Sequence, residues 1–134
     1  MNLSKTTSYA IRILTLMAKD KEAVYSSEQL YDSLKIPHKY LRRLLTELSK
    51  QGFIKSTRGR TGGFVFAKSL DEITLFEIID KIEGYDKMNA CILGMSECVL
   101  TKRPCPLHSK WCEAREKITM ILKETTLYDL VVTS

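Results

Sequence analysis

The sequence predicts a mainly α-helical protein with a small β-hairpin wing: a winged helix-turn-helix domain plus a long C-terminal dimerisation helix. Two amphipathic segments meet at Ile36-Pro37, two β-prone runs surround a glycine-rich tip, and a last helical pattern follows a cysteine-containing loop. At 134 residues, with 44% hydrophobic and 28% charged residues, the chain can bury one compact core.

The first two helices are predicted from capping residues and apolar spacing. A helix is expected to run to about Lys19, capped by an early hydroxyl residue, which is Ser4, Thr6 or Thr7. Its apolar side comprises Tyr9, Ala10, Ile13, Leu14 and Met17. Ser26 with Gln29 three residues later has the capping-box pattern and opens a short helix to about Leu34.

The next helix, from Pro37 to about Lys50, has an apolar side opposite a basic side. Its apolar residues recur at i, i+3, i+4 and i+7 and are Leu41, Leu44, Leu45 and Leu48. Polar and basic residues lie off that stripe: His38, Lys39, Arg42, Arg43, Thr46 and Lys50. One side is therefore expected to be buried and the other to face a partner.

Two β-prone runs, Phe53 to Thr57 and Phe64 to Ala67, predict a hairpin with a basic, glycine-rich tip. A helix fits the DNA major groove, and arginines on a slim tip can enter the minor groove. The candidate DNA contacts are His38, Lys39, Tyr40, Arg42, Arg43, Arg58, Gly59 and Arg60. The alternative is a solvated basic helix beside an ordinary hairpin.

The positive charge of the chain is concentrated in this region. Residues 35–68 carry nine Lys or Arg residues and one acid, Glu47, which makes a net charge of +8. The remaining residues carry twelve basic and fifteen acidic side chains, a net charge of −3. The overall +5 is therefore a local patch, which favours a partner such as double-stranded DNA.

Beyond the hairpin, Thr74 and Glu77 have the capping-box pattern as well, and an apolar stripe predicts a helix that ends at Gly84. Residues 85–111 are expected to be a loop, because Gly94, Pro104 and Pro106 interrupt any periodic pattern. A last helix is predicted from about Trp111 to Thr125, with a short tail to Ser134. Its stripe comprises Trp111, Arg115, Ile118, Ile121 and Leu122.

This pattern divides the chain into a DNA-binding domain (1–84), a cysteine loop (85–111) and a dimerisation helix with a tail (112–134). A helix beyond a loop has few partners within so small a chain, so a second copy is the expected partner. Packing on its own domain is the alternative. A homodimer would present two symmetric heads to a pseudo-palindromic operator.

Four cysteines follow one another with six residues between neighbours: Cys91, Cys98, Cys105 and Cys112. Together with His108 they suit an iron-sulfur cluster or zinc, although the missing C-x2-C pair disfavours zinc. Buried thiols or a redox disulfide are the alternatives. Nucleophilic catalysis by Cys105 with His108 would need a group that orients the histidine, and none is evident nearby. A zinc enzyme would need a catalytic acid beside the ligands, and no recognised signature supplies one. We therefore predict neither an enzyme nor a small-molecule substrate.

Several stretches together resemble the Rrf-two type winged-helix regulators of bacteria, which include the iron-sulfur cluster regulator and the nitric-oxide-sensing repressor. The matching stretches together span nearly the full chain. In the DNA-binding domain they are Ser8 to Arg12, Ile36-Pro37 through Leu41, Ser56 to Gly59 with Gly62-Gly63, Ile73 to Leu75, and Glu83-Gly84. The last is the cysteine motif Cys91-x6-Cys98-x6-Cys105-Pro106-Leu107-His108-x2-Trp111.

The resemblance implies a homodimeric transcription factor, usually a repressor, whose loop holds a [2Fe-2S] or [4Fe-4S] cluster. Cys91, Cys98 and Cys105 carry over as ligands, and His108 stands where the cluster regulator has its histidine. Cys112 is an extra candidate. The implied signal is redox state, nitric oxide or iron-sulfur status.

The sequence also indicates where the protein works. No apolar run is long enough to span a bilayer, and residues 1–20 contain Lys5 and Arg12 within an amphipathic pattern rather than a signal-peptide core. We therefore expect a cytoplasmic protein without a membrane partner. In that compartment, cysteines are more commonly thiols or metal ligands than disulfides.

Overall fold

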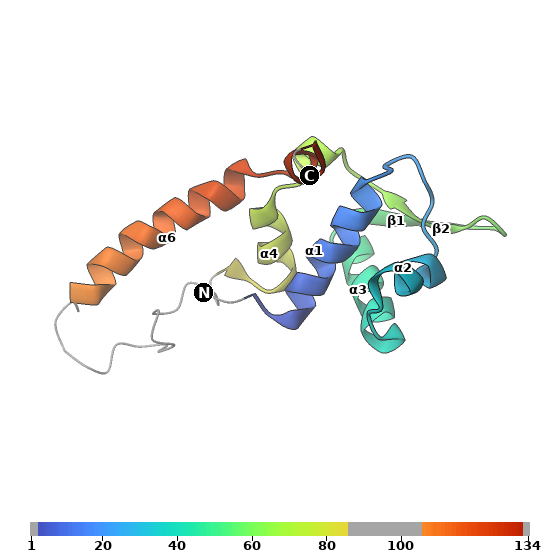
Figure 1. Ribbon diagram of the computed structural model, residues 1–134, viewed down its shortest axis with the longest axis horizontal. Coiled ribbons are helices and arrows are strands. Elements are labelled where there is room, and N and C mark those ends of the chain that lie inside the picture. Colours follow the sequence, from blue (N-terminus) through green and yellow to red (C-terminus); the bar gives the residue numbers. More distant parts are fainter. Residues whose placement is uncertain (1–2, 86–105, 133–134) are drawn as a thin grey trace.

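The structure is a computed structural model of the 134-residue chain and describes residues 3–85 and 106–132. Figure 1 shows α1 between α4 on one side and α2 with α3 on the other, while the hairpin and α6 project in opposite directions. The elements in order are α1 (Lys5–Ala18), α2 (Ser27–Leu34), α3 (His38–Lys50), β1 (Ile54–Thr57), β2 (Gly63–Phe66), η1 (Leu70–Glu72), α4 (Leu75–Ile82), α6 (Pro106–Glu124) and α7 (Leu127–Val132). The predicted winged-helix fold class is confirmed.

The core forms where the predicted apolar stripes meet around α1. The leucine stripe of α3 is buried, as are Ala10, Ile13, Leu14 and Met17 of α1. Tyr9, which was expected on that side, is only half-buried. The centre of the domain is thus made by local helical periodicity, with Phe53 and Ile54 adding the base of the hairpin.

The start of α1 is tied to the end of α4 by a hydrogen-bond network. Ser4 caps α1, because its hydroxyl accepts the N–H of Thr7 at 3.2 Å. The carboxylate of Glu83 accepts the N–H of Ser4 at 3.3 Å and the buried hydroxyl of Thr7 at 3.0 Å. Residues 79 positions apart therefore fix the two helices relative to each other.

The hairpin pairs β1 with β2 in antiparallel register, from Ile54 opposite Phe66 to Thr57 opposite Gly63. Tyr25, from the segment before α2, forms an isolated antiparallel bridge with Phe64 through two backbone hydrogen bonds of 3.0 and 2.8 Å. Burial, and then the negative charge of Asp20, raises the pKa of the Tyr25 hydroxyl above its usual value. The wing is thereby joined to the helix-turn-helix at its base.

Gly63 is required by this close approach of backbones. A Cβ atom at position 63 would lie 2.5 Å from the Tyr25 carbonyl oxygen and 2.8 Å from its carbon. We expect Gly63→Ala to lower the free energy of unfolding by about 1–3 kcal/mol, because backbone rather than a flexible side chain must shift. Urea unfolding measures this loss, and Thr61→Ala at the exposed tip is the control. Equal stability of the two variants would contradict the assignment.

The C-terminal region differs from the prediction in two ways. The helix α6 begins at Pro106 rather than near Trp111, because proline at the first helical position costs no hydrogen bond and starts the helix instead of interrupting it. The expected tail is wrong: residues 127–132 form α7, and Leu127 is fully buried in the core. Its N–H donates to the Ile73 carbonyl at 2.9 Å, so the chain returns to its own domain.

Three smaller features complete the described part of the chain. The turn of 3-10 helix at residues 70–72 was not predicted, and α3 begins one residue later than expected, with Pro37 as its N-cap. Gly52 has the positive φ, 86°, that its position after α3 predicts. None of the helices in the described ranges combines the length and apolar character needed to cross a bilayer.

Candidate nucleic-acid interface

The outward side of α3 carries the cationic surface. Lys39, Arg43, Thr46 and Lys50 recur at i, i+4, i+7 and i+11, opposite the leucine stripe, and all four are exposed. Arg42 is exposed beside them. Because the leucines lock the opposite face into the core, these side chains have a fixed backbone from which to reach a partner.

The two edges of α3 have different surroundings. On one edge, Tyr40 is half exposed, and its ring centroid lies 6.5 Å from that of Tyr9 in α1. Tyr40 and Arg43 also line a hollow of 300 Å³ with Thr6, Glu47 and Ile82. On the other edge, the His38 imidazole stacks on the Tyr31 ring of α2. Of the predicted contacts, Tyr40 and His38 are thus partly engaged within the protein.

The wing tip exposes Arg58, Gly59 and Arg60 together. Gly59 has φ 109°, a conformation that favours glycine, and its carbonyl accepts the N–H of Gly62 at 3.0 Å. The N–H of Gly63 donates to the Thr57 hydroxyl at 3.1 Å and closes the turn. The tip is therefore narrow enough to carry two arginines away from the body of the domain, where Figure 1 shows it extending beyond the helices.

One cation of the basic segment serves the fold instead. The Lys68 ammonium forms an ion pair of 2.6 Å with Glu77 of α4 and lies 5.6 Å from the Phe53 ring centroid. Within residues 3–85 and 106–132, by contrast, no carboxylate lies within ion-pair distance of Lys39, Arg42, Arg43, Arg58 or Arg60. These five charges are available to an anionic partner.

The predicted metal ligands fall mostly outside the described residues. Cys91, Cys98 and Cys105 lie in the segment that the structure does not describe, and His108 is placed only as a backbone position of α6. Cys112 is half-buried one helical turn further along α6. No group of three His, Cys, Asp or Glu residues that could hold a metal occurs in the described ranges, so a centre would need the undescribed cysteines.

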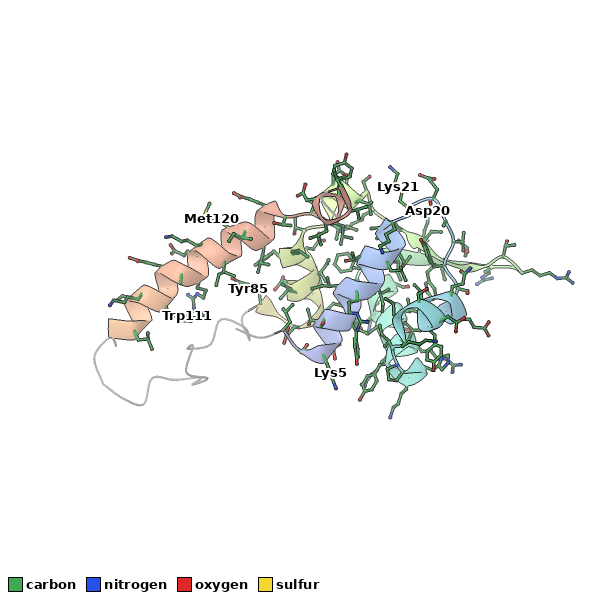
Figure 2. All side chains as sticks on the ribbon, viewed as in Figure 1. Lys5, Asp20, Lys21, Tyr85, Trp111 and Met120 are labelled. Carbon is green, nitrogen blue, oxygen red and sulfur yellow. The ribbon has the colours of Figure 1, made fainter. Side chains whose placement is uncertain are left out.

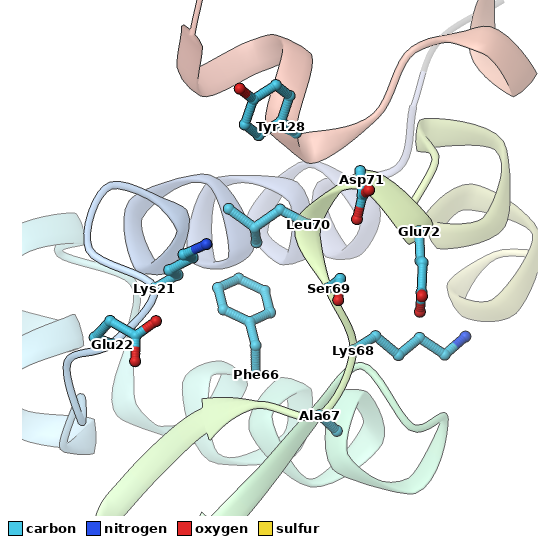
Figure 3. A pocket seen from close by; sticks show the side chains of 10 residues that line it. All are labelled: Lys21, Glu22, Phe66, Ala67, Lys68, Ser69, Leu70, Asp71, Glu72 and Tyr128. Atoms are coloured by element: carbon cyan, nitrogen blue, oxygen red, sulfur yellow. The ribbon is translucent and has the colours of Figure 1, made fainter.

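A larger hollow of 730 Å³ lies apart from the cationic surface (Figure 3). It is bounded by β2, η1, Tyr128 of α7 and the turn that follows α1. Its charged lining consists of Lys21 and Lys68 against Glu22, Asp71 and Glu72. Since acids outnumber lysines there, the hollow does not extend the cationic surface.

Comparison with known proteins decides the family. The model of the Rrf2 family, described as iron-dependent transcriptional regulators, matches residues 3–133. The chain belongs to the Rrf2 family. This Rrf2 protein is a transcriptional regulator, and the resemblance noted in its sequence is confirmed.

Individual relatives cover nearly all of this Rrf2 chain. It is 34% identical over 132 residues to an HTH-type transcriptional regulator of Aquifex aeolicus, with 98% of this chain and 92% of the relative covered. It is 32% identical over 133 residues to the regulator NsrR of Geobacillus kaustophilus, with coverage of 98% and 90%.

Solved structures agree with the fold of the Rrf2 protein. CymR, the global cysteine regulator of B. subtilis, superposes with a TM-score of 0.83 at 27% identity, covering 100% of this chain and 98% of that one. The structure of T. potens IscR, at 23% identity, superposes with a TM-score of 0.79 over 99% and 88% of the two chains.

The list of candidate contacts left out Lys50, although the sequence placed it on the polar side of the helix, and it did not include Tyr31. Lys50 continues the row that starts at Lys39, and its spacing could have placed it among the candidate contacts. Tyr31, which touches His38, has no comparable signal, because its contact joins two helices across a turn. The surface of the Rrf2 protein is thus wider than the eight predicted residues.

Proposed function

We propose that this Rrf2 regulator binds a pseudo-palindromic duplex as a homodimer and acts as a repressor. The observation that supports this most is the pairing of an exposed cationic side of α3 with two exposed arginines on the wing of the same rigid domain. Lys39, Arg42 and Arg43 would contact the major groove or its phosphates, with Tyr40 and His38 at the edges of the helix. Arg58, Gly59 and Arg60 would contact the minor groove.

The second copy would pack on α6. This helix has 19 residues and is about 28 Å long. Over much of its length it projects away from the other helices (Figure 1). Met120 is 58% exposed and Ile121 61% exposed, and Figure 2 shows Met120 on the side facing away from α4. Ile121 was predicted within the apolar stripe, and its exposure in one chain supports burial against another.

A charge placed in this face should separate the copies. We expect Ile121→Glu to convert a dimer into a monomer of half the mass, because two carboxylates would be desolvated in one symmetric interface. Light scattering coupled to size exclusion measures the mass. Ser33→Glu is the control, since it adds one carboxylate at an exposed position of α2, on the other side of the molecule from α6 (Figure 1). An unchanged mass for Ile121→Glu would exclude this face.

We further propose that Cys91, Cys98, Cys105 and His108 hold an iron-sulfur cluster, with Cys112 as an additional candidate ligand. Soft thiolates with one imidazole fit such a group by the chemistry of the donor set. When bound, the cluster would supply a centre that oxidation or nitric oxide alters. The family description, iron-dependent regulation, supports this assignment.

A change in the cluster would act on the rest of the protein through residues on both sides of the cysteine segment. Tyr85, directly before the segment, hydrogen-bonds through its hydroxyl to Thr119 of α6 and packs on Phe76, with ring centroids 4.7 Å apart. The Lys123 ammonium lies 4.8 Å from the Phe76 ring centroid. Glu83 holds the end of α4 to α1, so strain at the segment would act on both α6 and the DNA-binding domain.

A spectrum of anaerobically purified protein tests the cofactor. We expect visible absorption with matching counts of iron and acid-labile sulfide, and their loss in Cys98→Ser because one thiolate ligand is removed. Cys112→Ser is the control, and retained absorption there would remove Cys112 from the ligand set. A colourless protein with stoichiometric zinc would contradict the cluster and leave a zinc site.

A second candidate uses the same cysteines as thiols that form reversible disulfides, without a metal. It is favoured by the likeness to CymR, which is described as a cysteine regulator. Thiol chemistry needs only proximity of two sulfur atoms and an oxidant. Anaerobic protein without iron, sulfide or zinc, whose duplex affinity changes reversibly with dithiothreitol, would establish this form of sensing.

A further inference from the structure

The turn between α2 and α3 contains an aromatic stack. The rings of Tyr31 in α2 and His38, the first residue of α3, have centroids 3.8 Å apart and planes 16° from parallel. Tyr31 is half-buried and packs against the hydrophobic core, whereas His38 is exposed. One ring is therefore anchored in the domain, and the other faces the solvent at the start of the helix proposed to enter DNA.

The backbone that carries these rings is held at several points. Lys35 has the left-handed φ of 56°, and its N–H donates to the Tyr31 carbonyl at 2.7 Å. The Arg12 guanidinium of α1 donates to the Leu34 carbonyl at 3.2 Å. Ile36, two residues after Leu34, is 1% exposed. Because the turn is fixed, the Tyr31 ring has a defined position relative to the first turn of α3.

The position of His38 gives this stack a consequence for DNA reading. Side chains at the N-terminal end of a recognition helix contact base edges in the major groove. An exposed side chain otherwise populates several staggered rotamers and loses that freedom on binding. A nearly parallel ring at 3.8 Å already restricts the imidazole in the free protein. His38 therefore loses less conformational entropy when DNA binds.

We infer that Tyr31 is a positioning residue for base recognition. It keeps the His38 imidazole in one plane, from which a ring N–H can donate to the N7 of a purine in the major groove. Tyr31 itself does not contact the base. This inference rests on the proposed binding of duplex DNA by α3, and it adds the residue that sets the specificity of that helix.

Variants at both positions separate positioning from plain stability. Tyr31→Phe keeps the ring and its stack, Tyr31→Leu keeps an apolar side chain without a ring, and His38→Ala removes the reading group. Each protein is used to select duplexes from a random library, and its affinity is then measured for the selected duplex and for single-base changes of it. The ratio of two affinities does not depend on the fraction of protein that is folded.

Wild type and Tyr31→Phe are expected to select the same motif. Tyr31→Leu and His38→Ala should lose preference for a purine at the same single position, by about threefold to tenfold, which is the range expected for ordering one side chain. The double variant should lose no more than His38→Ala. All four variants should keep the wild-type salt slope, since none of them changes a Lys or Arg residue.

Retention of the full preference by Tyr31→Leu or by His38→Ala would overturn the inference, as would losses that add in the double variant. Loss of preference by Tyr31→Phe would also overturn it, because the stack requires the ring and not the hydroxyl. If wild type selects no motif at all, the proposed duplex recognition fails, and the inference falls with it. Failure of the inference alone gives a different result, in which wild type selects a motif and Tyr31→Leu keeps the full preference for it.

Discussion

Removal of the two wing arginines by Arg58→Ala with Arg60→Ala is expected to weaken operator binding by about 10- to 100-fold at 0.1 M salt. The same change should reduce the slope of log affinity against log salt by about 3.6, since the dimer loses four arginines, two from each copy, and each phosphate-neutralising cation contributes about 0.9. Both side chains are exposed at a glycine-rich tip and take no part in the core, so the fold should remain intact. Titration of a labelled duplex over a series of salt concentrations measures both quantities.

The matched control removes the same charge elsewhere. Lys21→Ala with Lys81→Ala lowers the net charge of each chain by two at exposed positions in the turn after α1 and in α4, outside α3, the wing and α6. We expect a much smaller change in affinity and an unchanged slope, because exposed charges farther than a Debye length are screened. Equal effects of the two double variants would mean that only overall charge matters, and the wing would lose its assigned role.

Truncation of Leu127 in α7 is expected to lower the free energy of unfolding by about 2–5 kcal/mol, the usual cost of Leu→Ala in a core. Leu127 is fully buried in the cluster that includes α1, and Thr126 forms a bridge with Thr74. Its removal would leave a cavity between the C-terminal residues and the DNA-binding domain. Urea unfolding followed by circular dichroism measures the difference.

Val132→Ala is the control for this substitution. Val132 belongs to the same short helix and is 61% exposed, so its truncation should change the free energy of unfolding by less than about 0.5 kcal/mol. Comparable stabilities of the Leu127→Ala and Val132→Ala proteins would show that α7 is not part of the folding unit.

The local elements of this protein could be predicted well from residue patterns. Ser26 and Gln29 form the predicted capping box, and the four leucines of α3 are all buried. These features depend on residues three or four positions apart, and that distance lies within one helical turn. The same reasoning predicted the turn at the tip of the wing from its glycines, because a tight turn constrains residues that are neighbours in the sequence.

Patterns were less informative where distant parts of the chain meet. The contact of Leu127 with the core, the hydrogen bonds of Glu83 to the start of α1 and the bridge from Tyr25 to Phe64 each join separate segments. Pro106 shows the related ambiguity that a proline can end or begin a helix. The metal ligands Cys91, Cys98 and Cys105 remain a prediction, as do His108 and Cys112.

Sequence alone determined the winged-helix class, the concentration of positive charge in residues 35–68 and the two arginines of the tip, since each follows from periodicity, composition or turn chemistry. Only the tertiary structure decided that Lys68 is paired with Glu77, that Tyr31 lies against His38 and that α7 closes the core. Such contacts arise when several elements bury apolar surface at once, and the spacing within any single element does not specify which distant residue will be the partner.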